Sequence, residues 1–216
     1  LIFFSVIAAF SLIYQVYMGP LNFLVDTSAR AGLTRYPSTF GSLTIYGGAV
    51  GIIKYASEVN GRSIDSSMIR SDFLEEYSKN CFVETKLVQG MSDLLELLDK
   101  NGVRWGIVTN KHSKYVNKII DGLNITNRLS CLVTGNMVNE PKPAPDSLIH
   151  AMCLLEEQPK NIIYVGDDER DIIAGKTAGV HTVAADFGFI RDSSEVNTWN
   201  ADKIIKEPIE LKTIIN

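Results

Sequence analysis

The first 25 residues of this 216-residue chain contain no charged side chain, and Asp26 is the first one. Leu1–Met18 is almost continuously apolar, long enough for a membrane-spanning helix or the apolar part of a signal peptide, but no Lys or Arg precedes it. The other interpretations are a buried strand followed by a buried helix, or a chain whose beginning is not its natural beginning, and we favour these over membrane insertion. We therefore expect a cytoplasmic protein without a membrane partner.

Several other features are missing. No run of basic residues occurs and the net charge is −4, so a nucleic-acid partner is not expected. Cys81, Cys131 and Cys153 are odd in number and fall in no metal-binding spacing, which is typical of reduced thiols in the cytoplasm. With 45% apolar and 21% charged residues, the composition is that of an ordinary globular protein, which we expect to be a monomer or a homodimer.

Short apolar runs alternate with helical patterns over the second half of the chain. This alternation predicts a parallel sheet with helices on both faces. The first strand is expected at Leu1–Phe4, and later ones at 105–108, 131–134, 162–165, 182–185 and 203–205. Helices are expected at 64–80, from a cap at Ser92 to about residue 100, at 113–123, 145–155 and 171–178, and from Pro208 onwards. The fold class is therefore α/β, a Rossmann-like core of residues 1–14 and 88–216 with a small helical domain, residues 15–87, inserted after the first strand.

An acidic stretch follows the expected strand at 162–165. Asp167, Asp168, Glu169 and Asp171 are four acids within five residues. A solvated loop is one interpretation. The other is a site for a hard divalent cation, because Mg²⁺ binds one or two carboxylates together with waters and phosphate oxygens.

Polar residues also follow two other expected strands. Thr109-Asn110-Lys111 comes after the strand at 105–108, and Lys142 lies in the segment Pro141–Pro145, which contains three prolines. Parallel sheets bind ligands beyond the carboxyl ends of their strands, so these residues should share one edge with the acidic stretch. Alone, Thr109 could cap a helix and Lys142 could be a surface lysine. Together they provide a hydroxyl, backbone amides, an ammonium and carboxylates, which suit a phosphoryl group and Mg²⁺.

These three segments match motifs of a known family. The stretches Ile107–Asn110, Lys142 with its prolines, and Gly166–Asp171 resemble the second, third and fourth motifs of the haloacid dehalogenase superfamily of phosphatases. Within it, the chain is most similar to the subgroup of phosphoglycolate phosphatase and N-acetylmuramic acid 6-phosphate phosphatase. The resemblance runs from about Gly32 to the C-terminus.

The resemblance implies a Mg²⁺-dependent phosphatase that acts on a small phosphorylated metabolite through an aspartyl-phosphate. Its implied site residues are Thr109 and Asn110 for the phosphoryl oxygens, Lys142 for charge neutralisation, and Asp167, Asp168 and Asp171 for the metal. The inserted helical domain would be a cap that closes over the substrate, and with the loop near His112 it would select that substrate.

One family motif is missing. The family places Asp-x-Asp-Gly-Thr after the first apolar strand, whereas a strand at Leu1–Phe4 puts Ser5 at the position of the nucleophile and Ile7 at that of the acid/base. An alternative alignment uses Asp26 as the nucleophile, with Ser28 and Arg30 at the following motif positions.

Three interpretations of this departure stay open. The first 30 residues could be a corrupted or shifted reading of an ordinary phosphatase, the protein could bind phosphate and Mg²⁺ without turnover, or Asp26 could have taken over catalysis.

Overall fold

The computed structural model describes residues 5–8, 13–15, 66–82, 85–187 and 193–215. The expected strand Leu1–Phe4 and most of the inserted segment lie outside these residues. The chain divides into two compact units, one of Leu1–Ile13 with Leu87–Asn216 and the other of Tyr14–Lys86. These boundaries fall one residue from those expected for the core and the inserted domain.

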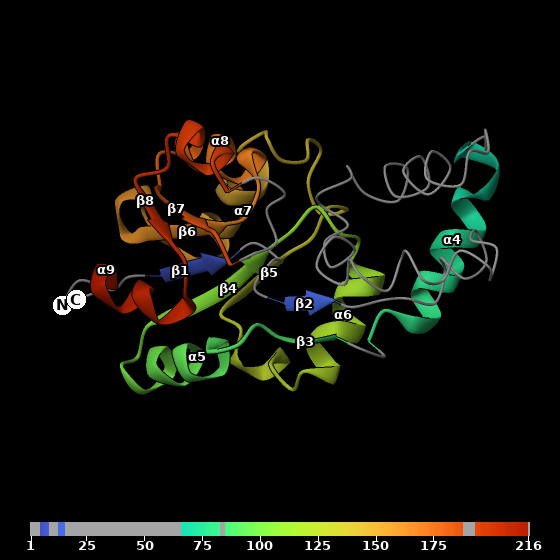
Figure 1. The fold of residues 1–216 in the computed structure, drawn as a ribbon, viewed down its shortest axis with the longest axis horizontal. Helices are drawn as coiled ribbons and strands as arrows, with labels where there is room; N and C mark the ends of the chain where they lie inside the picture. Colours follow the sequence, from blue (N-terminus) through green and yellow to red (C-terminus); the bar gives the residue numbers. More distant parts are fainter. Residues whose placement is uncertain (1–4, 9–12, 16–65, 83–84, 188–192, 216) are drawn as a thin grey trace. The chain divides into compact units, whose positions relative to one another are not determined.

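The larger unit is built on a six-stranded parallel sheet (Figure 1). Its strands are β1 (Ser5–Ala8), β4 (Arg104–Val108), β5 (Cys131–Val133), β6 (Ile162–Gly166), β7 (His181–Ala185) and β8 (Lys203–Ile205), in the order β5-β4-β1-β6-β7-β8. Each pair is parallel. The predicted α/β fold with a parallel sheet is confirmed.

The central strands are apolar on both faces because helices cover both faces of a parallel sheet. All five residues of β6 are buried, as are the last four of β4. A Cβ on Gly106 of β4 would lie 2.4 Å from the sulfur and 2.6 Å from the carbonyl oxygen of Cys131 in β5, so this position has no room for a larger residue. The apolar runs of β4 and β6 made these strands recognisable in the sequence.

The helices of this unit are α5 (Met91–Lys100), α6 (Ser113–Gly122), α7 (Asp146–Leu155), α8 (Glu169–Ala178) and α9 (Lys212–Ile215), with short 3₁₀ turns η3 (Thr126–Arg128), η4 (Pro159–Asn161), η5 (Glu195–Trp199) and η6 (Pro208–Leu211). Figure 1 shows α7 and α8 on one face of the sheet and α5 on the other. Leu148, Met152 and Leu155 of α7 are buried in one core cluster with Val108 and Tyr164 of the sheet.

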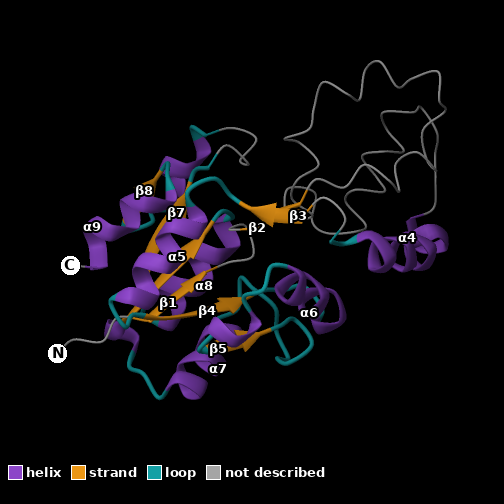
Figure 2. Cartoon of the chain, turned by 90° about the horizontal axis from the view of Figure 1, so that it is seen from below, coloured by secondary structure: helices purple, strands orange, loops and turns teal. Residues whose placement is uncertain are grey.

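The described part of the smaller unit is mainly α4 (Ser66–Asn80) (Figure 2). Phe73 and Tyr77 of this helix are buried. This helix agrees with the one expected at 64–80. A two-stranded sheet pairs β2 (Ile13–Gln15) with β3 (Thr85–Leu87), at the two places where the chain passes from one unit to the other.

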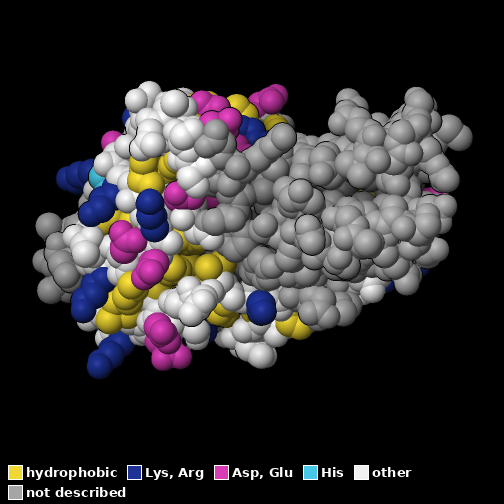
Figure 3. Space-filling view, viewed as in Figure 1, with side chains coloured by type: hydrophobic (Ala, Val, Ile, Leu, Met, Phe, Trp, Pro, Cys, Tyr) yellow, Lys and Arg dark blue, Asp and Glu magenta, His cyan; other side chains and the backbone are white. Residues whose placement is uncertain are grey.

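Two parts of the apolar segment Leu1–Met18 are strands, namely β1 and β2. The segment is therefore not one continuous helix, and the helix expected after the first strand is not formed at Ile13–Gln15. Among the residues that the structure describes, no helix is long and apolar enough to cross a membrane. On the face shown in Figure 3, basic and acidic side chains are interspersed over the described surface.

Candidate active site

The carboxyl ends of β4, β1 and β6 meet at the point where the chain reverses its direction of travel across the sheet. From β1 the chain adds β4 and β5 on one side, then crosses to β6 and continues to β7 and β8 on the other. Ligands in open parallel sheets bind at such a switch point. Thr109 follows β4 and Asp167 follows β6, so they flank the end of β1 on its two sides.

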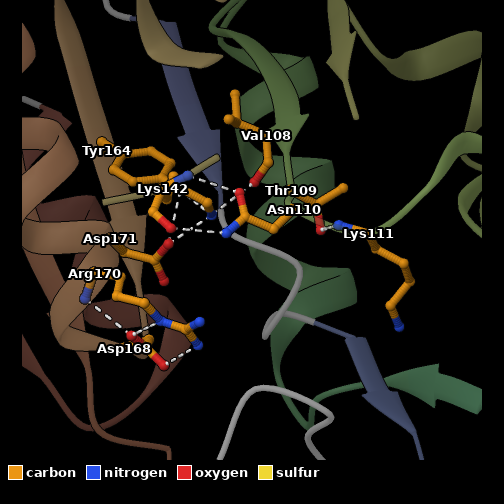
Figure 4. Close-up of polar contacts among 9 residues, drawn as sticks. All are labelled: Val108, Thr109, Asn110, Lys111, Lys142, Tyr164, Asp168, Arg170 and Asp171. Carbon is orange, nitrogen blue, oxygen red and sulfur yellow. Dashed lines mark hydrogen bonds and ion pairs between the residues drawn. The ribbon is translucent and has the colours of Figure 1, made fainter. Parts of the chain in front are cut away.

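Lys142 is brought to this edge from the segment after β5, and its side chain is 6% exposed. Its ammonium donates to Asp171 Oδ1 at 2.5 Å, to the hydroxyl of Tyr164 at 2.7 Å and to the carbonyl of Val108 at 3.3 Å (Figure 4). An ammonium has three N–H donors, so these three acceptors satisfy it. Lys142 is therefore a buried, fixed cation and not a surface lysine.

Asp171 is the counter-ion of Lys142, with a side chain that is 4% exposed. It lies in the first turn of α8, close behind β6, where a Cβ on Gly166 would come within 2.3 Å of Asp171 Cβ. Breaking a buried ion pair is costly because the remaining charge is then left without compensation in a poorly polarisable interior. The pair thus ties the Lys142 segment to α8.

Tyr164 completes this buried group, and its role could not be recognised from the sequence. Its hydroxyl accepts from Lys142 and donates to Asp171 Oδ1 at 3.1 Å. Full burial, and then the negative charge of Asp171, raise the pKa of Tyr164 well above its ordinary value. Tyr164 is therefore a neutral hydroxyl that links the two charges.

Thr109 is 4% exposed and sits at the start of the turn after β4. Its backbone N–H donates to the carbonyl of Val133, which continues the β4–β5 pairing, and its hydroxyl accepts from the backbone N–H of Lys111 at 3.1 Å. The cap of α6 is instead His112, whose Nδ1 accepts from the backbone N–H of Lys114. Thr109 thus stabilises the turn itself and does not cap the helix.

The side chain of Asn110 is bound to the backbone of Lys142 in both directions. Its Oδ1 accepts from the N–H of Lys142 at 2.9 Å, and its Nδ2 donates to the carbonyl of Lys142 at 3.0 Å (Figure 4). We expected Asn110 to contact the phosphoryl group. In the structure its carboxamide is instead bound to the backbone of Lys142.

Asp168 is held by Arg170. Oδ1 accepts from both the backbone N–H and Nε of Arg170, and Oδ2 accepts from its Nη2 at 2.8 Å. Burial alone would raise the pKa of Asp168, but the hydrogen bonds from Arg170 outweigh it and keep that pKa below its ordinary value. Asp168 also caps α8, which explains why this helix begins at Glu169 and not at the predicted Asp171.

The structure supports a smaller set of Mg²⁺ ligands than the three carboxylates that the sequence predicted. Within the described segments, no three His, Cys, Asp or Glu side chains are grouped so that they could hold a metal ion. Both oxygens of Asp168 accept from Arg170, and Lys142 and Tyr164 both donate to Oδ1 of Asp171. The carboxylate of Asp167, directly after β6, and that of Asp171 in the first turn of α8 are the hard oxygen ligands that this segment can offer. They suit Mg²⁺, which can complete its shell with waters and phosphate oxygens.

The expected position of the nucleophile is wrong. Ser5 is the first residue of β1 and is level with Arg104 and Ile162, the first residues of β4 and β6. It therefore lies at the amino edge of the sheet, a full strand length from Thr109 and Asp167. Ile7 lies within β1 as well. The family pattern places its first carboxylate after this strand, where the sequence reads Ala9-Phe10-Ser11-Leu12.

Asp26, the alternative nucleophile, lies outside the described residues. So do Ser28 and Arg30. No Asp or Glu precedes Asp26, so β1 and the residues immediately after it supply no carboxylate.

The arrangement agrees with comparisons to known proteins. Residues 51–185, more than half of the chain, match the sequence family described as haloacid dehalogenase-like hydrolase. The chain belongs to this family. The match includes Thr109, Lys142 and Asp167, so the resemblance inferred from the motifs is confirmed.

Individual relatives point to phosphatases. The chain is 35% identical to the N-acetylmuramic acid 6-phosphate phosphatase of Pseudomonas putida over 172 residues, which cover 80% of this chain and 77% of that protein. It is 34% identical to the phosphoglycolate phosphatase of Xanthomonas campestris pv. campestris over 140 residues, or 65% of this chain and 63% of the relative. By resemblance, this haloacid dehalogenase-like chain is a phosphatase.

A solved structure shares the fold. The crystal structure of a predicted phosphoglycolate phosphatase from Haemophilus somnus 129pt superposes with a TM-score of 0.78 at 18% identity, covering 100% of this chain and 99% of that one. At this identity the likeness supports the fold alone.

Proposed function

We propose that this chain is a Mg²⁺-dependent phosphomonoester hydrolase of a small phosphorylated metabolite. The observation that carries the proposal is the buried Lys142 ammonium, fixed beside the turn after β4 and the acidic loop after β6. Keeping a cation there requires the compensating group of Asp171 and Tyr164. A buried cation with such compensation suits a site that must stabilise negative charge.

Each residue then has a distinct task. The hydroxyl of Thr109 and the backbone N–H groups of its turn hold phosphoryl oxygens, and Lys142 offsets the negative charge that the phosphoryl group brings. Asp167 would hold Mg²⁺, with Asp171 as a second carboxylate. When bound, the metal supplies Lewis-acid stabilisation of the phosphoryl oxygens. Asp168 keeps the acidic loop in place through its cap and Arg170.

The substrates to test first are those of the relatives, N-acetylmuramic acid 6-phosphate and phosphoglycolate. In this proposal the inserted unit acts as a cap that excludes water, and the protein works in the cytoplasm as a monomer or homodimer. The hydrolytic step would pass through an aspartyl-phosphate. Asp26 is the candidate for the aspartate that carries it, because it is the first carboxylate in the sequence.

Phosphate release from both substrates and from an aryl phosphate tests the proposal, with and without EDTA. We expect turnover that EDTA and Asp167→Asn each abolish. Asp26→Asn shows whether that carboxylate is the nucleophile, because its loss should then abolish turnover while Mg²⁺ binding persists.

A chain without turnover requires a second variant. Ala9→Asp with Ser11→Asp places two carboxylates directly after β1 at the spacing of the family motif. Turnover gained in this variant would show that the rest of the site is competent. Phosphate and Mg²⁺ binding without turnover in either form would favour a binding protein on the same fold, and absence of both binding and turnover would refute the proposal.

A further inference from the structure

The Lys142 segment has two separate attachments, and only one of them involves its charge. The ammonium is held by Asp171, Tyr164 and the carbonyl of Val108. The backbone is held by the carboxamide of Asn110. Asn110 belongs to the turn after β4, so the second attachment joins two segments that are 32 residues apart in sequence.

The two hydrogen bonds from Asn110 imitate the pairing of one strand residue with another. A carboxamide can both donate and accept, and here it meets a backbone N–H and a backbone carbonyl of the same residue. The hydrogen bonds therefore fix both the distance and the orientation of the Lys142 backbone relative to Thr109. Neither Ala nor Ser can reproduce both bonds, and ionised Asp can only accept.

Further bonds make the Asn110 turn a rigid support. The carbonyl of Lys111 accepts from the N–H of Gly135, and the N–H of Ser113 donates to Oδ1 of Asn136. A Cβ on Gly135 would lie 2.2 Å from the carbonyl oxygen of Asn110, so the segment after β5 lies directly against this turn. A small displacement of the turn would thus be transmitted to Lys142.

We propose that Asn110 is a positioning residue for Lys142, which it fixes through the Lys142 backbone, and that its side chain is not a phosphate ligand. The consequence for phosphate binding rests on the proposed function, whereas the positioning itself does not. In this assignment the turn after β4 holds the phosphoryl oxygens with its own N–H groups and also sets the place of the cation that faces them.

The positioning is tested by acetic anhydride labelling of the full chain, with the rate at Lys142 measured by mass spectrometry relative to exposed Lys160. The wild-type protein should label slowly at Lys142. Asn110→Ala should raise this ratio about tenfold, because the two hydrogen bonds that hold the Lys142 backbone are lost and its ammonium becomes accessible more often. Asn110→Asp keeps the shape and the acceptor, so it should give an intermediate rise and serves if the alanine variant does not fold.

The matched control is Asn101→Ala. Asn101 also donates from its side chain to a backbone carbonyl, that of Leu97 at 2.7 Å, but it lies at the exposed end of α5. It should leave the Lys142 ratio unchanged. A ratio that stays within twofold of wild type in both Asn110 variants, or that rises equally in the control, would overturn the proposal.

Calorimetry with inorganic phosphate and Mg²⁺ separates this inference from the proposed function. If wild type binds phosphate, Asn110→Ala should weaken binding about fivefold together with the change in labelling. If wild type binds none while the labelling changes as expected, the proposed function fails and the positioning role stands. Weaker phosphate binding with unchanged labelling would show that Asn110 is a ligand itself and would refute the inference.

Discussion

The buried group of Lys142, Tyr164 and Asp171 should behave as one energetic unit. Asp171→Asn leaves the ammonium without its counter-charge, and Lys142→Met leaves the carboxylate without its cation. Both side chains are nearly inaccessible to water, which could otherwise compensate. Each single variant should therefore lower the free energy of unfolding by about 3–5 kcal/mol.

The double variant Lys142→Met with Asp171→Asn should lose much less than the sum of the two. Neither remaining side chain is charged, so the main penalty of each single variant disappears. We expect a coupling free energy of about 2 kcal/mol or more. Tyr164→Phe keeps the ion pair and removes only the bridging hydroxyl, and it should cost about 1–2 kcal/mol.

Guanidinium unfolding followed by tryptophan fluorescence measures these changes. Both tryptophans, Trp105 and Trp199, lie in the unit that contains the pair. A change in midpoint at constant m-value would report stability alone. A cycle on the more exposed pair of Arg128 and Asp99 in the same unit is the control, with an expected coupling below about 1 kcal/mol.

Two outcomes would refute this reasoning. One is a decrease of less than about 1 kcal/mol in the free energy of unfolding of Asp171→Asn, because a buried unpaired ammonium should destabilise the fold by more than that. The other is a double variant whose loss equals the sum of the single losses, because the two charges would then act independently.

Other predictions concern the acidic loop and the thiols. Arg170 keeps the pKa of Asp168 below its ordinary value of 3.8, so the stability that Arg170 adds should be complete near pH 6 and lost as the pH falls below about 4. The difference in free energy of unfolding between wild type and Arg170→Gln, measured at a series of pH values from acid to neutral, should therefore vanish at low pH. Burial raises the pKa of Cys131 to about 11, so at pH 8 a thiol reagent should label exposed Cys153 quickly and Cys131 only on unfolding; fast labelling that persists in Cys153→Ser would contradict this. Gly166→Ala should cost about 1–3 kcal/mol in thermal unfolding, because its Cβ would overlap the buried aspartate of α8.

The strands of the second half could be predicted because their physical signature is local. A buried parallel strand is a short apolar run ended by polar residues, and β4 and β6 both have that form. The N-terminal segment lacks such boundaries. Its apolar residues continue past both ends of β1, so nothing in the sequence marked Ser5 as the beginning of the strand.

Helix starts show a similar division. Pro208 begins η6, as predicted, and Glu207 and Glu210 form a capping box there. Ser92 was a wrong choice for the cap of α5. That helix begins at Met91, after Gly90 with a left-handed φ of 79°, a conformation that glycine adopts without strain.

The motif residues of the site could be predicted, but their partners could not. Thr109, Lys142 and Asp167 are recognised by type and position in the sequence. Tyr164 looks like any aromatic residue in a buried strand, and only the folded chain shows its hydroxyl between Lys142 and Asp171. The role of Asn110 likewise depends on a contact between distant segments, for which the sequence carries no local sign.

The place of β1 in the sheet affects how the chain can fold. Among the strands that the structure describes it comes first in the sequence, yet it pairs with β4 on one side and β6 on the other, both of which come far later. Until β6 has formed and paired with it, β1 exposes unpaired backbone N–H and C=O groups, even when β4 is already in place on its other side. Strands of other chains could pair with these groups. Variants that weaken Ser5–Ala8 should therefore aggregate during refolding, although they touch none of the site residues.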